Sequence, residues 1–100
     1  MKMYVLVRDD APPGFDWVAV AHGPLSCYLQ YQDDPDMQTW VKTSFRKAVC
    51  RVTPEEYERA KQAGKYVVIT ESSLGGQELA LVFAPRSEWP KMFRFLKLCK

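Results

Sequence analysis

A short hydrophobic segment near the start of the chain constrains the fold more than any other feature. Residues 2–8 read Lys-Met-Tyr-Val-Leu-Val-Arg, with five hydrophobic residues in a row. Side chains alternate between the two faces of a strand, so this run predicts an interior strand of a sheet that is covered on both faces. Charged residues from Arg8 to Asp10 follow at once, and α/β proteins place ligands at such a strand end.

The next segment predicts a turn and then an interrupted helix. Two prolines and a glycine at 12–14 exclude helix before Phe15. Hydrophobic residues then follow helical spacing, but Gly23-Pro24 lies inside the pattern, and proline removes a backbone donor. We therefore expect a kinked helix or two short ones, ending at the acidic stretch 33–36. A connector or short helix should follow over 37–45.

The middle of the chain holds the clearest helix signal. Residues 47–52 predict a second strand, which stops at the sequence Thr53-Pro54-Glu55-Glu56. A threonine N-cap, a proline at the first helical position and a glutamate three residues after the cap form a capping box. This pattern predicts a helix over 54–63, with Gly64 as its left-handed C-terminal cap.

Two more strands and a final helix complete the predicted fold. Residues 66–70 predict an interior strand, and a turn at 72–76 leads to an antiparallel strand over 78–84. After Pro85, hydrophobic residues at helical spacing predict an amphipathic helix, or a helix that ends in an extended tail at 96–98. The order β-α-β-α-β-β-α predicts one α/β domain over 1–100, a mixed four-stranded sheet with helices on its faces.

Composition excludes several classes of protein. Hydrophobic residues at 47% and charged residues at 26% are ordinary for a globular chain and exclude disordered and fibrous classes. No hydrophobic run approaches the roughly 18 residues of a membrane helix, and the N-terminus lacks the features of a signal peptide. We therefore expect a soluble, cytoplasmic protein without membrane association. The three cysteines show neither CxxC nor Cys/His spacing, so we expect reduced thiols, no metal site and no cofactor.

Charge is distributed unevenly along the chain. Residues 1–36 hold two basic and six acidic side chains, residues 37–65 seven and three, and residues 66–100 five and three. The last two thirds could present a basic face to nucleic acid, or these cations are simply solvated. The final segment interleaves aromatic and basic residues as single-strand binders do. A core-facing aromatic stripe with a solvated basic back explains the same pattern.

Three motifs in serial order resemble those of the type 2 (archaeal-type) peptidyl-tRNA hydrolases. The first family motif reads approximately R-x-D-L, a loop, then G-K-x-A-A-Q-x-x-H-A. The matching residues here are Arg8, Asp10, Gly14, Ala21 and His22. Trp40 ahead of the second strand and Leu96-Lys97-Leu98 near the end resemble two further family features. The family's lysine falls on Phe15 and its glutamine on Ala19.

The resemblance implies the family's α/β fold, hydrolysis of the ester between a peptide and tRNA, and tRNA as partner. A second family motif, near D-A-G-R-T-Q, falls on residues 71–77 in a shortened form, with Glu71 in the aspartate's place. Catalysis would then use a water nucleophile and the residues Asp10, His22 and Glu71. Substrate binding would use Arg8, Gly14, Ser72, Ser73 and Lys97.

Simpler roles for the same residues stay open. Arg8 and Asp10 can pair with each other and shape the loop rather than face a ligand. A lone histidine on the inward side of a helix is commonly a hydrogen-bonded core residue, which applies to His22. Glu71 can be a solvated carboxylate at a strand end.

Three functions are consistent with these observations. The first is a peptidyl-tRNA hydrolase with a rearranged site. The second is an inactive relative that binds tRNA, a nucleotide or another small ligand in the same cleft. The third is a protein-interaction module, such as a homodimer, that uses exposed Trp17, Trp40 or Tyr28. Fold resemblance alone does not select among them.

Overall fold

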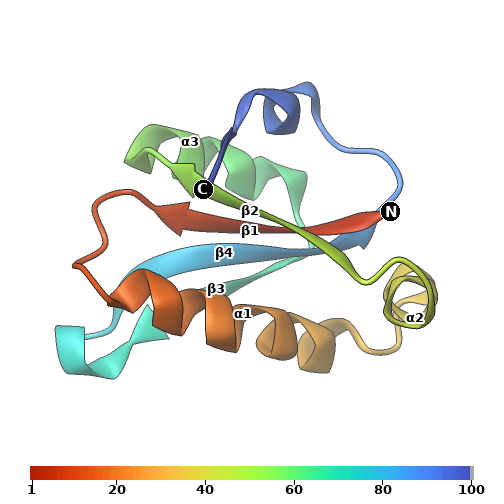
Figure 1. Ribbon diagram of the computed structural model, residues 1–100, viewed down its shortest axis with the longest axis horizontal. Coiled ribbons are helices and arrows are strands. Elements are labelled where there is room, and N and C mark those ends of the chain that lie inside the picture. The colour runs from red at the N-terminus through yellow and green to blue at the C-terminus, as the bar shows by residue number, and fades with distance from the viewer. Residues whose placement is uncertain (100) are drawn as a thin grey trace.

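Five strands form a mixed sheet in the order β3-β4-β1-β2-β5 in the computed structural model, which describes residues 1–99 (Figure 1). The central strand β1 (Lys2–Arg8) pairs parallel with β2 (Arg46–Val52) and antiparallel with β4 (Gln77–Arg86). The two edges are β3 (Tyr66–Glu71), antiparallel to β4, and β5 (Lys97–Leu98), antiparallel to β2. The prediction of four strands is therefore wrong by one, and the strand predicted over 66–70 lies at an edge rather than in the interior, whereas the mixed α/β sheet is confirmed.

Helices cover both faces of this sheet (Figure 1). On one face lie α1 (Phe15–Tyr31) and α2 (Pro35–Lys42). On the other face lie α3 (Pro54–Ala60), its 3-10 extension η1 (Lys61–Ala63) and the 3-10 helix η3 (Lys91–Phe95). A third 3-10 turn, η2 (Ser72–Leu74), joins β3 to β4.

The sheet has a hydrophobic core on each face, and the interior strand β1 contributes side chains to both, as its sequence predicts. Met3, Val5 and Val7 pack beneath α1 and α2, whereas Tyr4 and Leu6 pack beneath α3 and η3. All five side chains are buried. The second core is rich in aromatic rings, which pack mainly edge to face.

α1 is one continuous helix with Pro24 inside it, so of the two expectations at Gly23-Pro24 the pair of short helices is wrong. Gly23 lies against β4, where a Cβ atom would come within 2.6 Å of Val82 Cγ2. The missing side chain lets the helix approach the sheet closely. Most helical stability in proteins comes from such packing, and here it outweighs the backbone bond that Pro24 removes.

The capping box at the start of α3 is confirmed. Glu56 N donates to Thr53 Oγ1 at 3.1 Å, and Thr53 N donates to Glu56 Oε1 at 2.9 Å. α3 and η1 together end at Ala63, and Gly64 follows with φ 72° and ψ 178°. The positive φ agrees with the predicted glycine cap, but the ψ is extended rather than left-handed helical.

The C-terminal segment departs most from its prediction. β4 extends to Arg86, so little chain remains between it and Pro90, and a five-residue 3-10 helix forms instead of an amphipathic α-helix. The extended tail becomes the edge strand β5, and Cys99 N donates to Val49 O at 2.8 Å. Over residues 1–99, no helix combines the length and the apolar character needed to cross a membrane.

Candidate functional site

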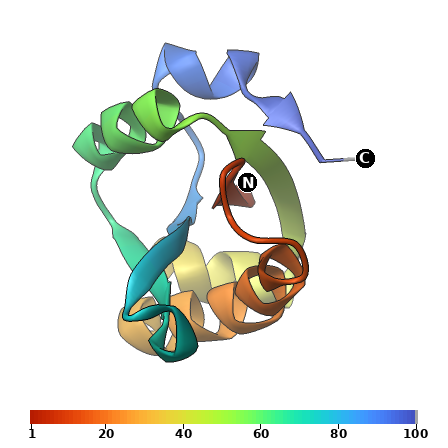
Figure 2. The same cartoon turned by 90° about the vertical axis from the view of Figure 1, so that its left-hand side faces the viewer.

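The topology gathers the predicted site residues near one end of the sheet. β1, β2 and β3 run in the same direction, so their carboxyl ends share this end, which faces the viewer in Figure 2. β1 leads to α1 on one face, whereas β2 leads to α3 on the other. Open α/β sheets bind ligands at such a switch point. A hydrogen bond joins the segment after β1 to the end of β2, since Asp9 N donates to Val52 O at 2.8 Å.

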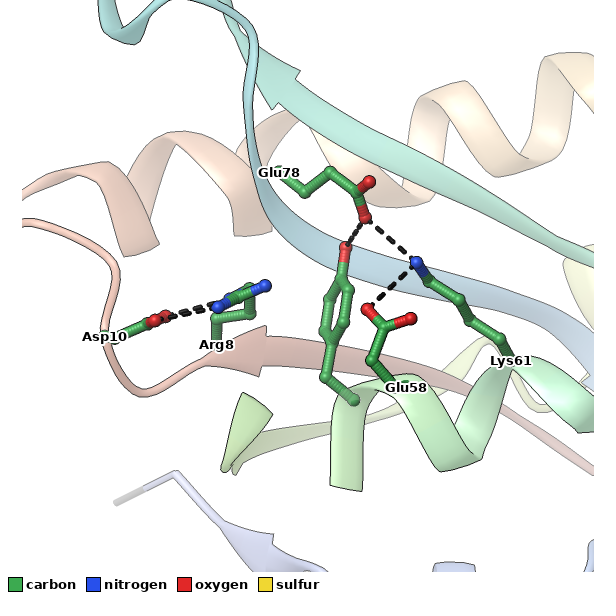
Figure 3. A network of polar contacts seen from close by, with 6 residues as sticks. Arg8, Asp10, Glu58, Lys61 and Glu78 are labelled. Atoms are coloured by element: carbon green, nitrogen blue, oxygen red, sulfur yellow. Dashed lines mark hydrogen bonds and ion pairs between the residues drawn. The ribbon is translucent and has the colours of Figure 1, made fainter. Parts of the chain in front are cut away.

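Arg8 and Asp10 pair with each other at this end of β1 (Figure 3). Arg8 Nε and Nη2 donate to the two carboxylate oxygens of Asp10 at 2.9 and 2.8 Å. The bidentate bond raises the pKa of Arg8 and lowers the pKa of the Asp10 carboxyl. The predicted pairing of these two residues is therefore present. The Asp10 carboxylate is consequently a weak proton acceptor.

A second polar network lies beside Arg8, and sequence reasoning missed it. The buried Tyr57 donates its hydroxyl to Glu78 Oε1 at 2.7 Å, and Lys61 Nζ contacts Glu78 Oε1 at 3.3 Å and Glu58 Oε2 at 3.1 Å (Figure 3). The Arg8 guanidinium lies 5.1 Å from the centre of the Tyr57 ring. Burial, followed by the bond to Glu78, raises the pKa of Tyr57, and the same bond lowers the pKa of Glu78.

One sequence feature could have indicated this network. Tyr57 lies at a core-facing position of α3, and a buried tyrosine hydroxyl usually requires a hydrogen-bond partner. Glu78, at the start of β4, gives no signal of its own, since its partner is distant in sequence.

Glu71 is engaged within its own turn. Its carboxylate accepts from Ser73 N at 3.2 Å and from Ser73 Oγ at 2.9 Å. These bonds lower the pKa of Glu71, and the charge of His22 adds to the effect. His22 itself is exposed on α1, so its prediction as a core histidine is wrong. Ser72 is exposed in the same turn as Ser73.

The predicted catalytic residues share one region but not a hydrogen-bonded site. β4 lies between β1, which precedes Asp10, and β3, which ends at Glu71, so two strand spacings, or about 10 Å, separate these two strands. Lys97 lies on β5, opposite Arg51, so four spacings, or about 19 Å, separate its strand from that of Glu71. Within residues 1–99, no hydrogen bond joins Asp10, His22 and Glu71 to one another.

A hollow of about 240 Å³ lies beside the switch point, between α1 and β2. Its side chains are mainly apolar and include the indole of Trp17, which is 79% exposed. Arg51 Nη2 lies at its rim, 3.3 Å from Asp16 Oδ2. Gly14, with φ 90°, turns the chain into α1, and Phe15 packs against the core below. Phe15 therefore anchors the start of this helix.

This arrangement is suited to binding more than to proton transfer. The carboxylates of Asp10, Glu71 and Glu78 all have lowered pKa values because each accepts hydrogen bonds. A general base works best with a pKa near the operating pH. The described part of the chain also contains no group of three His, Cys, Asp or Glu side chains placed to hold a metal ion.

Comparison with known proteins adds no relative, because neither a scan against protein-family models nor a search of curated proteins finds a match for this chain.

Proposed function

We propose that this protein is a relative of the type 2 peptidyl-tRNA hydrolases that binds tRNA at the switch-point hollow and does not efficiently hydrolyse its ester. One observation carries this proposal. An exposed indole and a guanidinium line the hollow together, whereas the carboxylates needed for hydrolysis are committed to other partners. Such a function implies a cytoplasmic protein.

Trp17 and Arg51 have the chemistry that single-stranded nucleic acid requires. An exposed aromatic ring can stack on a base, which contributes about 1–3 kcal/mol per base. Arg51 pairs with Asp16 at 3.3 Å on an exposed surface, and such pairs are weak. A phosphate can therefore compete with Asp16 for the guanidinium.

The element order supports the family resemblance without deciding it. From β1 to β4 the chain follows the order that the resemblance implies, with α2 as an added short helix over part of the predicted connector. Ester hydrolysis stays as the alternative activity of the same region. It would need Asp10 or Glu71 to leave its present partner and accept a proton from water.

Binding of fluorescent tRNA, followed by anisotropy, tests the proposal. Replacing Trp17 with alanine should weaken binding by about 5- to 150-fold, the loss of one stacked base. Phe95→Ala is the matched control, because Phe95 is 74% exposed on η3, away from the hollow. Equal losses in the two variants, or no binding by the wild type, would refute the proposal.

A second candidate function is self-association through the outer face of α1. Trp17, Ala21, Leu25 and Leu29 recur every four residues and are all exposed, Leu25 at 62% and Leu29 at 58%. An apolar helix face of this kind is typical of an interaction surface. Of the three aromatic residues predicted for such a surface, Trp17 is exposed, Tyr28 is half-buried, and Trp40 is buried, so the prediction for Trp40 is wrong.

Light scattering at several protein concentrations tests this second candidate. A dimer should be present in the wild type and lost in Leu25→Glu, whereas Phe95→Glu should leave it intact. A monomeric wild type at every concentration excludes a homodimer on this face.

A further inference from the structure

We propose that the opposite end of the sheet holds a binding site for a phosphoryl group, formed by the side chains of Lys2, Arg46 and Arg86. These cations lie at the amino ends of β1 and β2 and at the carboxyl end of β4, remote from the switch-point hollow. The site rests on its own contacts and charges and needs neither the family resemblance nor the proposed function.

Strand register aligns the three cations. Lys2 is paired with Arg46 across the parallel β1–β2 ladder and with Arg86 across the antiparallel β1–β4 ladder. Like charges on directly opposed residues of neighbouring strands destabilise a sheet. The three neighbouring cations therefore repel one another, and a bound anion would reduce that repulsion.

An irregularity in β4 creates this alignment. From Tyr4 to Val7 the β1–β4 register is regular, with Tyr4 opposite Phe83 and Val5 opposite Val82. Continued to Lys2, the same register would place Pro85 there, but the register shifts and Arg86 takes the position. Bulges at sheet ends commonly re-aim a side chain toward a functional site.

The protein supplies no counter-charge to these residues. None of the three forms an ion pair with a carboxylate within residues 1–99. Lys2 Nζ lies 5.0 Å from the centre of the Tyr4 ring, and the Arg86 guanidinium lies 5.3 Å from that of Trp89. These two rings pack edge to face with centroids 4.7 Å apart, so they support the two cations on the same side of the sheet.

Arg86 is already held in place for binding. Its Nη1 donates to Ala63 O at 3.0 Å and its Nε donates to Glu88 O at 3.1 Å. Neutral carbonyl groups fix the guanidinium without cancelling its charge. A fixed fork of donors loses little entropy when it binds an oxyanion, which favours phosphate over a diffuse counterion.

A hollow of about 260 Å³ accompanies the cations. It is lined by Met1, Lys2, Arg46, Arg86, Ser87 and Trp89. The indole N–H of Trp89 is buried and has no hydrogen-bond partner among the described residues. The polar side chains of the lining are almost all donors, and a phosphoryl group offers mainly acceptor oxygens at neutral pH. The chemistry of the hollow therefore matches a phosphoryl ligand.

Two measurements test this site and separate its two sources of phosphate. Amide NMR spectra with inorganic phosphate, against chloride at equal ionic strength, report a free phosphate. Anisotropy of a short fluorescent single-stranded RNA at several salt concentrations reports the phosphodiesters of a polymer. The test variant is Lys2→Gln/Arg46→Gln, because both side chains are exposed and the fold should tolerate the change. Arg59→Gln/Arg94→Gln is the control, since both residues are exposed and the net charge falls equally.

The site predicts phosphate-dependent shifts at residues 46 and 86, or RNA binding whose salt slope falls by about 1.4 in the test variant, about 0.7 for each lost cation. Either result supports the phosphoryl site and identifies its source. The control variant should keep the wild-type slope. If neither probe responds, or if the control loses as much as the test variant, the site is refuted. Trp17→Ala should leave the phosphate-dependent shifts unchanged. A negative result for tRNA binding at the switch-point hollow is therefore distinguishable from a negative result for the phosphoryl site.

Discussion

The close approach of α1 to β4 makes Gly23→Ala informative. Alanine is normally the better helix residue, and this exchange in a helix interior stabilises by about 1 kcal/mol. Here the new Cβ would lie 2.6 Å from Val82 Cγ2, about 1 Å inside the optimal separation of two carbon atoms. Val82 is fully buried in β4 and its β-branched side chain is stiff, so it cannot turn away easily.

Overpacking of this kind costs about 1–3 kcal/mol, which exceeds the gain in helix propensity. We therefore expect Gly23→Ala to lower the free energy of unfolding by about 1 kcal/mol, which corresponds to a fall in Tm of about 4–8 °C for a domain of this size. Val82→Ala alone should cost about 2 kcal/mol through the cavity it creates. In that background the new methyl group has room, and Gly23→Ala should stabilise by up to about 1 kcal/mol.

Urea denaturation of the four proteins in this double-mutant cycle measures the coupling. We expect a coupling energy of about 2 kcal/mol, with the effect of Gly23→Ala changing sign between the two backgrounds. If Gly23→Ala stabilises the wild type, or if the two substitutions are additive, the close packing of α1 on β4 is not what requires glycine at this position.

Three further perturbations follow from the buried network and the cysteines. Tyr57→Phe removes the hydroxyl that donates to Glu78 and should lower the free energy of unfolding by about 1 kcal/mol in urea denaturation; an unchanged midpoint would contradict the bond. Because the folded pKa of Glu78 is lowered, its contribution is present above its ordinary pKa and is lost as pH falls through the folded value. Denaturation between neutral and acidic pH should therefore show a smaller acid loss of stability in Glu78→Gln than in the wild type, and parallel curves would exclude this contribution. Burial raises the pKa of the Cys27 thiol to about 12 and that of Cys50 to about 11, so in the native protein a thiol reagent should modify Cys99 first, and rapid reaction at three sites would disprove the burial.

Local sequence signals predicted the elements that depend on local interactions. The run 2–8 is hydrophobic on both faces and forms the central strand, because such a segment is stable only between two layers. The capping box at Thr53 and Glu56 fixes the start of α3 through bonds between residues three apart. No distant contact is needed for either prediction.

The errors come from contacts between distant residues. Two short helices divided at Gly23-Pro24 do not form, because packing on Val82 holds the helix together, and no pattern within α1 reveals that contact. The edge strand β5 forms through pairing with β2, far away in sequence.

The site residues show the same limit. The position of Asp10 and Glu71 at one end of the sheet follows from strand direction, which the sequence order predicts. Their hydrogen-bond partners do not follow from it. The sequence left open whether Arg8 pairs with Asp10, and only the structure shows the two hydrogen bonds between them.

Incubation of the purified protein with an N-acetyl-aminoacyl-tRNA tests the central proposal most directly, with bound tRNA and released acyl group measured in the same samples. We expect the wild type to bind the tRNA with its ester intact, and Trp17→Ala to bind much less of it. In both proteins the acyl group should be released no faster than by spontaneous hydrolysis. Release that exceeds the spontaneous rate and disappears in Asp10→Ala or Glu71→Ala would contradict the proposal and establish a hydrolase.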